Sequence, residues 1–135
     1  MYVDGASNHN SVGAGVLLIS PEGVLHEQAI RLEFSASNNE AEYEALLAGL
    51  HEALELGVSD LTAFSDSQLV VGQMTGEYEA RDDRMGQYLS KAKELVARFA
   101  NFSLIQIKRD LNAHADILAG LAAIHGSDKH RTITF

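Results

Sequence analysis

The chain of 135 residues contains no cysteine and only one proline, Pro21. Without cysteine it cannot form a disulfide framework, a thiolate zinc site or an iron–sulfur cluster, and it has no cysteine nucleophile. It also has no apolar run near the ~18 residues that a membrane span needs, and no secretory signal pattern. A chain of this length buries enough surface to fold without disulfides. We therefore expect a soluble, monomeric, single-domain protein inside the cell, in the cytoplasm or the nucleus, without membrane contact.

Basic residues are scarce in the first part of the chain. Residues 1–80 carry 13 acidic side chains and one basic side chain, Arg31, whereas residues 81–135 carry nine basic and six acidic ones. The net charge of −9 argues against a polyanionic partner. Such an asymmetry between the two halves, however, is typical of a face shaped for phosphate or metal. A generally acidic surface is the alternative that charge alone does not exclude.

Hydrophobic periodicity predicts the element order β-β-β-α-β-α-α-β-α. The first strand, at Tyr2 and Val3, is expected to end before Asp4, and two apolar stretches around Pro21 predict an antiparallel hairpin over 14–34. The strongest helix spans 37–57, because its first residues match a capping box and a glycine follows its end. The remaining elements are a strand at 61–65, helices at 67–76 and 83–100, a strand at 103–108 and a helix at 112–124.

A hairpin followed by alternating helices and strands predicts an α/β fold with a mixed sheet flanked by helices. We assign residues 1–125 to this domain and residues 126–135 to a C-terminal tail. The first strand has little room to begin, which suggests a piece of a longer parent chain. Ligands of such sheets bind beyond the carboxyl ends of parallel strands.

Four acidic residues are expected at that edge of the sheet. Asp4 and Asp66 follow two strands that would be parallel neighbours, and Glu42 shares a helical row with buried leucines. Asp116 lies on a row of small residues that would let its helix approach the sheet. Carboxylates this close repel each other unless divalent cations neutralise them, and Mg²⁺ takes oxygen ligands. Two such ions ~3.5–4 Å apart clamp the attacking and leaving oxygens of a displacement at phosphorus.

Each acid also has a purely structural interpretation. Asp4 would lie in a turn, and Glu42 would cap its helix if Asn39 were the first helical residue. Asp66 would cap the helix that follows it, and Asp116 would be favoured in a first turn by the helix dipole. The convergence of all four at one edge favours a metal site over four separate structural roles.

Four stretches of the sequence, taken together, resemble type 1 ribonuclease H: YVDGASNHNSVGAGVLL, SNNEAEYEALLAGL, FSDSQLVVGQMTGEY and KRDLNAHADILAGLA. They run in the family's order from Tyr2 to about Ala123, and they are most similar to the ribonuclease H domains of plant gypsy-like LTR retrotransposons and to short-loop cellular relatives. The resemblance implies a five-stranded ribonuclease H-like fold. It also implies an endonuclease that hydrolyses the RNA strand of RNA–DNA hybrids with two Mg²⁺ ions, or Mn²⁺, leaving 5′-phosphate and 3′-hydroxyl ends.

The same resemblance assigns metal binding and catalysis to Asp4, Glu42, Asp66 and Asp116. It implies substrate contacts for six further residues: Asn38 and Asn39 in the minor groove of the hybrid, Gln68 near the RNA sugars, Ser37 and Asn112 at a DNA-strand phosphate, and Arg109 in the short loop. Helix capping is the alternative for Ser37 and Asn112. The loop lacks the family's mobile histidine, and we expect His114 to be exposed and turned away from the site.

The implied partners are the RNA–DNA hybrid and, within a retroelement polyprotein, a reverse transcriptase and an integrase domain. One rival function is a catalytically silent scaffold or nucleic-acid-binding module, and the presence of all four acids argues against it. Another is an integrase- or resolvase-type nuclease, which lacks the NNxAEY and SDSQ motifs. Residues 76–85 hold four acids against two arginines, so we expect weak, salt-sensitive binding of nucleic acid.

Overall fold

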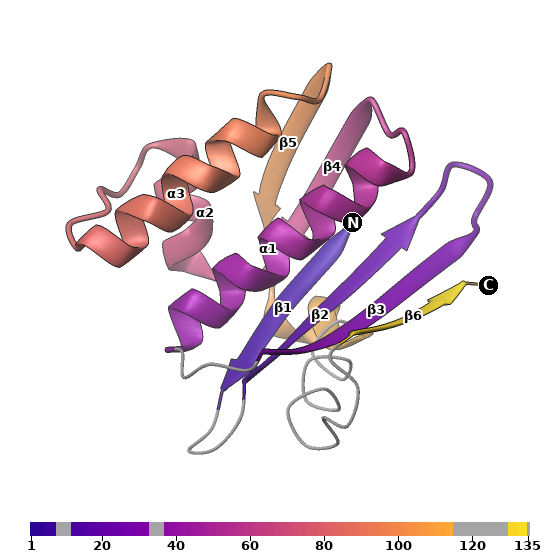
Figure 1. The fold of residues 1–135 in the computed structure, drawn as a ribbon, viewed down its shortest axis with the longest axis horizontal. Coiled ribbons are helices and arrows are strands. Elements are labelled where there is room, and N and C mark those ends of the chain that lie inside the picture. Colours follow the sequence, from indigo (N-terminus) through magenta and orange to yellow (C-terminus); the bar gives the residue numbers. More distant parts are fainter. Residues whose placement is uncertain (8–11, 33–36, 115–129, 135) are drawn as a thin grey trace.

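The computed structural model describes residues 1–7, 12–32, 37–114 and 130–134. They form one mixed sheet of strand order β5-β4-β1-β2-β3-β6 (Figure 1). Within it, β4 runs parallel to both β1 and β5, whereas the other neighbours are antiparallel. The strands are β1 Tyr2–Ser7, β2 Val12–Ile19, β3 Leu25–Leu32, β4 Asp60–Ser65, β5 Asn101–Gln106 and β6 His130–Thr134.

The five-stranded mixed sheet predicted from the sequence is confirmed, with the order β3-β2-β1-β4-β5. A sixth strand, β6, extends it at β3, in a segment that we expected to be a tail. The sequence of β6, HRTIT, is rich in β-branched residues, which favour strands. Pairing with β3 also satisfies backbone groups that an open edge would leave unpaired.

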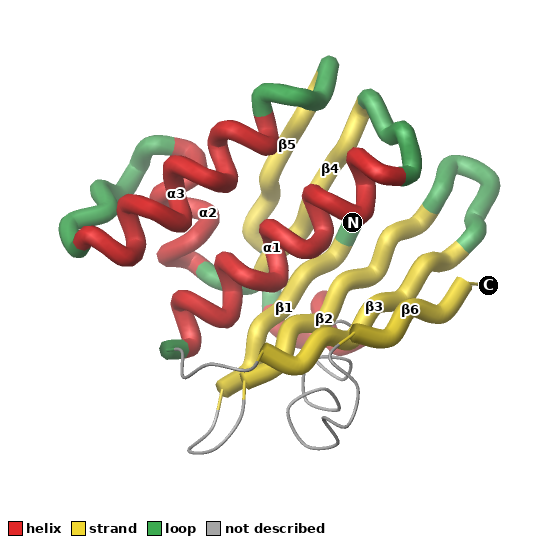
Figure 2. The backbone as a smooth tube through the Cα atoms, in the orientation of Figure 1, coloured by secondary structure: helices red, strands yellow, loops and turns green. Residues whose placement is uncertain are grey.

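Three helices cover the same face of the sheet: α1 Asn38–Glu55, α2 Gln68–Thr75 and α3 Asp83–Val96 (Figure 2). The start of α1 confirms the predicted capping box. The Ser37 Oγ accepts a hydrogen bond from the Glu40 backbone N–H at 3.2 Å, and the Glu40 Oε1 accepts one from the Ser37 N–H at 3.1 Å. No helix in the described part of the chain is long and apolar enough to cross a membrane.

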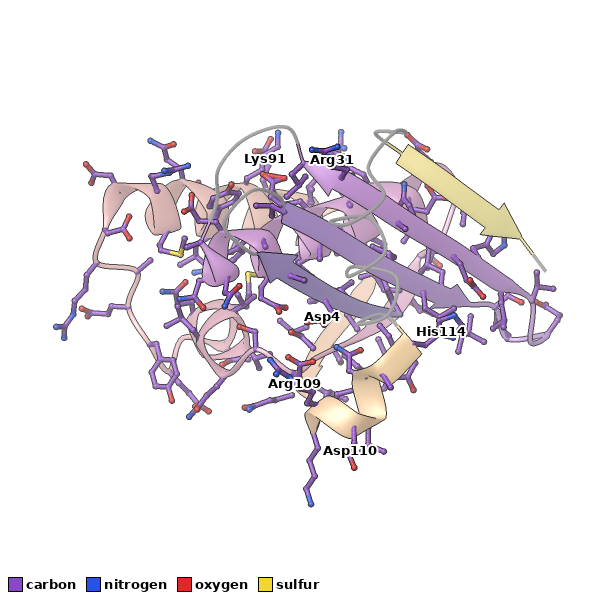
Figure 3. All side chains as sticks on the ribbon, turned by 90° about the horizontal axis from the view of Figure 1, so that it is seen from below. Asp4, Arg31, Lys91, Arg109, Asp110 and His114 are labelled. Atoms are coloured by element: carbon purple, nitrogen blue, oxygen red, sulfur yellow. The ribbon has the colours of Figure 1, made fainter. Side chains whose placement is uncertain are left out.

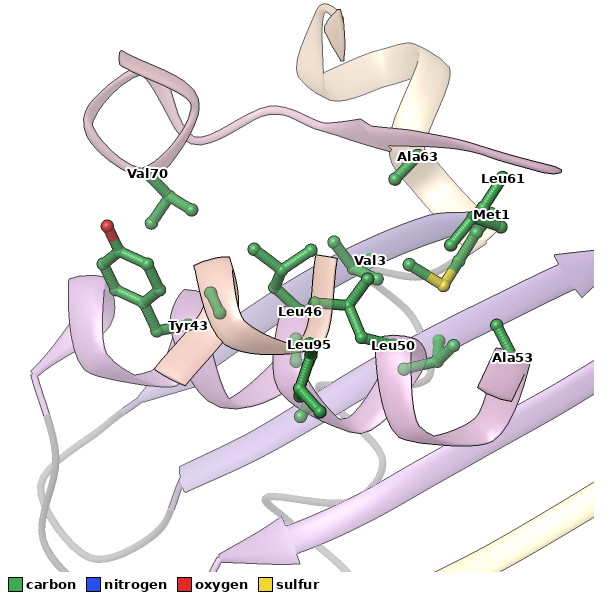
Figure 4. Close-up of a cluster of buried hydrophobic side chains, with 14 of the residues drawn as sticks. Met1, Val3, Tyr43, Leu46, Leu50, Ala53, Leu61, Ala63, Val70 and Leu95 are labelled. Atoms are coloured by element: carbon green, nitrogen blue, oxygen red, sulfur yellow. The ribbon is translucent and has the colours of Figure 1, made fainter. Parts of the chain in front are cut away.

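The hydrophobic core lies between the sheet and α1, with α2 and α3 closing it at the side (Figure 4). Leu46 and Leu50 of α1 are fully buried against Val3 of β1, and Val70 of α2 and Leu95 of α3 belong to the same cluster. Burial of each such side chain stabilises the fold by ~1.5–3 kcal/mol. This packing holds the first turns of α1 over β1, where the acidic residues lie.

Several expected boundaries differ from the structure. Strand β1 continues to Ser7, β5 begins two residues before the expected position, and α3 ends at Val96 rather than at residue 100. The start of β5 follows from its partner, since Asp60 pairs with Asn101 and the Asn101 Nδ2 donates to the Asp60 Oδ1 at 2.7 Å. The last expected helix begins as a 3₁₀ turn, η1 Arg109–Asn112, and residues 115–124 of it lie outside the described residues.

Candidate active site

Asp4 lies inside β1, whereas the sequence predicted that this strand ends before Asp4. It pairs with Gly15 of β2, and pairing with β2 continues to Ser7. On the other side, β4 pairs with β1 only as far as Val3 and Ser65. From Asp4 onward β4 therefore leaves that edge of β1 uncovered, and side chains from other elements can meet there. Asp4 is buried, and the alternative that it lies in a turn is wrong.

The next residue, Gly5, is the point where α1 crosses β1 most closely. A Cβ atom on Gly5 would lie 2.3 Å from the Ala41 carbonyl carbon, so a side chain here would clash with the helix backbone. The close crossing brings Glu42 to the open edge of β1, where its carboxyl forms hydrogen bonds with the Asp4 side chain and the Gly5 backbone. The capping alternative for Glu42 is wrong, because Glu40 fills that role.

Asp66 reaches the same edge from β4, directly after Ser65. The cap of the following helix is Ser67, whose Oγ accepts a hydrogen bond from the Val70 N–H at 3.2 Å. Asp66 therefore does not serve as that cap. Its Oδ2 instead accepts a hydrogen bond from the Asn112 Nδ2 at 2.9 Å.

Oxygen atoms of Asp4, Glu42 and Asp66 lie within 4.8 Å of one another. The three side chains come from β1, from α1 and from the link between β4 and α2, and they converge at one edge of β1 as the sequence predicted. Two unit charges 4 Å apart repel by ~1 kcal/mol in water and ~4 kcal/mol near a protein surface. Three ionised carboxylates at this spacing therefore need a proton or a cation among them.

The pKa of Glu42 reflects its burial and the neighbouring negative charge. Burial, and to a lesser extent the negative charge of Asp66, raise the pKa from the ordinary value of 4.5 to about 7. Hydrogen bonds with Asp4 and Gly5, and the positive charge of Arg109, act in the opposite direction. Without a cation, the cluster therefore holds a proton at higher pH than an isolated carboxyl group does.

The donor set fits a hard divalent cation. All three ligands are carboxylate oxygens, the type that Mg²⁺ and Mn²⁺ prefer. The Glu42 Oε2 is buried and has no hydrogen-bond partner among the described residues, which costs free energy unless a ligand satisfies it. Asp116, the fourth predicted acid, lies outside the described residues, although Ala113 and His114 already have helical backbone after η1.

Two groups of predicted substrate contacts lie at the starts of helices. Ser37, Asn38 and Asn39 are exposed at the N-terminus of α1, one turn before Glu42. Gln68 is exposed as the first residue of α2, two positions after Asp66. Both helix starts therefore flank the carboxylates, and their backbone N–H groups favour negative charge nearby.

Arg109 and Asn112 belong to η1 but differ in environment. Arg109 is exposed, and its charge acts on Glu42; in the view of Figure 3 it lies close to Asp4. Asn112 is only 1% exposed, and its Nδ2 donates to the Val3 carbonyl at 2.8 Å as well as to Asp66. This burial argues against the phosphate contact that the resemblance implies for Asn112, and the side chain instead ties η1 to β1.

His114 turns toward β3 rather than toward the carboxylates. Its Nε2 lies 3.1 Å from the Glu27 Oε1, and its side chain is 45% exposed. The expected exposure of His114 is confirmed.

Tyr78 contacts a predicted substrate-binding residue, and this contact was not predicted from the sequence. The Tyr78 hydroxyl accepts a hydrogen bond from the Gln68 Nε2 at 2.9 Å. The sequence feature that could have indicated this contact is Gly72, a glycine inside a predicted helix, six residues before Tyr78.

A mixed sheet of this strand order, with carboxylates gathered where β1 runs past β4, defines the class of ribonuclease H-like proteins. Comparison of the sequence with protein families gives the same class, because the family described as reverse transcriptase-like matches residues 2–122. Among curated proteins, ribonuclease HI of Halobacterium salinarum is 37% identical over 123 residues, which are 90% of this chain and 62% of that protein.

Solved structures agree with this assignment. The crystal structure of RNase H1 from Halobacterium salinarum has a TM-score of 0.85 and 36% identity, with coverage of 90% of this chain and 93% of that one. LC11-RNase H1 in complex with an RNA/DNA hybrid also has a TM-score of 0.85, with 27% identity and coverage of 94% and 97%. The chain belongs to the reverse transcriptase-like family and, within it, to the type 1 ribonucleases H.

The chain spans only part of several curated relatives. It covers 62% of the Halobacterium protein and 33% of the bifunctional protein Rv2228c of Mycobacterium tuberculosis, to which it is 31% identical.

Proposed function

We propose that the chain is an endonuclease that hydrolyses the RNA strand of RNA–DNA hybrids and leaves 5′-phosphate and 3′-hydroxyl ends. The observation that carries this proposal is the cluster of Asp4, Glu42 and Asp66, whose oxygens lie within 4.8 Å of one another. Family membership and the likeness to LC11-RNase H1, which was solved with an RNA/DNA hybrid, support the choice of substrate.

In this proposal Asp4, Glu42 and Asp66, together with Asp116, hold two Mg²⁺ ions, for which Mn²⁺ can substitute. When bound, such ions supply a water of lowered pKa and stabilise negative charge on the phosphate and the leaving oxygen. Asn112 keeps Asp66 oriented through the hydrogen bond to its Oδ2. Arg109 supports the bound state with a positive charge that favours ionised Glu42 and can meet a phosphate with its planar guanidinium.

The exposed amides around the cluster recognise the hybrid. Asn38, Asn39 and Gln68 can each donate and accept hydrogen bonds, which suits the minor groove and the 2′-hydroxyl of RNA. Ser37 accepts a hydrogen bond from Glu40 but can still donate its own hydroxyl proton to a phosphate of the DNA strand.

The setting of the domain is part of the proposal. The wording of the NNEAEYEALLAGL and SDSQLVVGQ motifs supports an origin in a retroelement polyprotein, with reverse transcriptase and integrase domains as neighbours. Such a protein acts inside the cell, in the cytoplasm or the nucleus. If the protein binds the hybrid but does not cut it in the assay below, the domain is instead a catalytically silent module.

A cleavage assay with four substrates tests the proposal. End-labelled RNA–DNA hybrid, RNA duplex, DNA duplex and single-stranded RNA of one sequence are incubated with the protein in Mg²⁺, in Mn²⁺ and in EDTA. We expect the hybrid alone to be cut, and only with a divalent ion. Equal cutting of the RNA duplex, or full activity in EDTA, would contradict the proposal. Binding of the hybrid without cutting would indicate the silent module.

A further inference from the structure

The loop after α2 folds back onto that helix through Tyr78. The Tyr78 backbone N–H donates to the Gly72 carbonyl at 3.1 Å. Its ring lies directly on Gly72, since a Cβ atom there would be 2.2 Å from the Tyr78 Cδ2. Glycine inside a helix costs ~1 kcal/mol relative to alanine. The ring on Gly72 explains why α2 carries a glycine at this position.

The ring position places the Tyr78 hydroxyl beside the first residue of α2. The Gln68 Nε2 donates to this hydroxyl at 2.9 Å, although both side chains are exposed. An amide whose nitrogen is engaged in this way directs its carbonyl oxygen to the other side. An exposed glutamine loses rotamer entropy when it binds a partner, and a neighbour that already orders it reduces this loss.

We propose that Tyr78 is a positioning residue for recognition of the RNA strand. It holds the Gln68 amide with the carbonyl oxygen presented as an acceptor for a 2′-hydroxyl of the hybrid. This inference rests on the proposed function and adds a residue to it. Because DNA lacks the 2′-hydroxyl, a fixed acceptor favours the hybrid over a DNA duplex of the same sequence.

Two substitutions test the contact between Tyr78 and Gln68, one by removing the hydroxyl and one by displacing the ring. Tyr78→Phe keeps the ring on Gly72 but removes the hydroxyl that accepts from Gln68. Gly72→Ala keeps the hydroxyl but displaces the ring, while alanine favours the helix. Tyr88→Phe is the matched control, because it removes a tyrosine hydroxyl that donates to the Glu44 Oε1 at 3.0 Å, on α1, rather than one that accepts from Gln68.

Binding and turnover are measured with the whole chain. Fluorescence anisotropy in EDTA gives the Kd for the hybrid and for the DNA duplex, and steady-state cleavage in Mg²⁺ gives kcat and KM. We expect Tyr78→Phe and Gly72→Ala to raise the hybrid Kd and KM by about threefold to tenfold, with kcat within about twofold of wild type. The Kd for the DNA duplex and the melting temperature of Tyr78→Phe should not change, and Tyr88→Phe should bind like wild type.

A double-mutant cycle separates positioning from a general effect on the fold. Gln68→Ala should weaken hybrid binding as Tyr78→Phe does, and the two together should weaken it no further. Additive effects, equal weakening of hybrid and DNA duplex, or a Tyr78→Phe variant with wild-type Kd and KM would overturn the inference. A wild-type chain that shows the expected binding pattern but never cuts the hybrid contradicts the proposed activity and leaves the role of Tyr78 supported.

Discussion

Single residues set the distances within the carboxylate cluster. Gly5 permits the close crossing of α1 and β1 that brings Glu42 to Asp4. Asn112 fastens η1 to the Val3 carbonyl and to Asp66 with one amide group. The three acids are thus held together before any cation binds, at a cost in electrostatic repulsion that a bound cation relieves.

Asp66→Asn should abolish activity without unfolding the protein. The change removes a metal ligand, so we expect hybrid cleavage to fall by more than about 100-fold. It also removes one negative charge from the cluster, so the free energy of unfolding should stay equal or rise by about 1 kcal/mol. Asp60→Asn, at the other end of β4, is the control and should cut at the wild-type rate. Wild-type turnover by Asp66→Asn would contradict its role as a ligand.

The pKa of Glu42 predicts how stability depends on pH without metal. An acid whose folded-state pKa is raised from 4.5 to about 7 stabilises the fold while protonated and loses this contribution as pH rises through 7. In EDTA, the free energy of unfolding from urea titrations should fall between pH 5 and pH 8 in wild type. Glu42→Gln should flatten this decline, whereas Glu55→Gln, at the exposed end of the same helix, should retain it. A decline of equal size in Glu42→Gln would refute the assignment.

Arg109 and His114 should differ in their effects on catalysis. Arg109 acts on the cluster by charge, whereas His114 contacts Glu27 on β3. We expect His114→Ala to change kcat by less than about threefold. Arg109→Ala should raise KM for the hybrid, and more strongly at low salt, because the lost phosphate contact is electrostatic and salt screens it. Kinetics of both variants at two salt concentrations decide this, and a large kcat loss for His114→Ala with a near-normal Arg109→Ala would reverse the assignment.

At the scale of elements, the crossing of α1 over β1 is the contact on which the site depends. In Gly5→Ala the added methyl group would meet the Ala41 and Glu42 backbone within 2.5 Å, so α1 must shift. We expect a loss of about 3 kcal/mol in the free energy of unfolding and weaker Mn²⁺ binding in calorimetry. Gly86→Ala in α3, where a Cβ atom meets nothing within 4 Å, should instead stabilise by up to ~1 kcal/mol. Equal stability of the two variants would contradict this view of the crossing.

Local patterns explain how much of the fold and site could be predicted. The capping box of α1 and the helical row of Glu42 are read from neighbouring residues, so the helix start and the inward carboxylate were predicted correctly. The burial of Asn112 depends on Val3, 109 positions away, and sequence spacing does not contain such a contact. The extent of β1 and the pairing of β6 likewise depend on partner strands, so their boundaries were missed.

At the scale of the whole molecule, charge distribution limits the affinity for nucleic acid. The chain has a net charge of −9, and the loop 76–82 carries more acids than bases. Phosphate contacts supply most of the non-specific affinity of nucleic-acid-binding proteins. Discrimination by the domain alone therefore depends on the exposed amides near the cluster, and its affinity for the hybrid should be low and sensitive to salt.

A hybrid with different fluorescent labels on its RNA and DNA strands tests the central claim most directly. The protein is incubated with it in Mg²⁺, and both strands are separated on one denaturing gel, with Asp66→Asn and Asp60→Asn in parallel lanes. We predict that wild type and Asp60→Asn shorten only the RNA strand, to products with 3′-hydroxyl ends, and that Asp66→Asn leaves both strands intact. Cutting of the DNA strand, or an intact RNA strand with the wild-type protein, would contradict the claim.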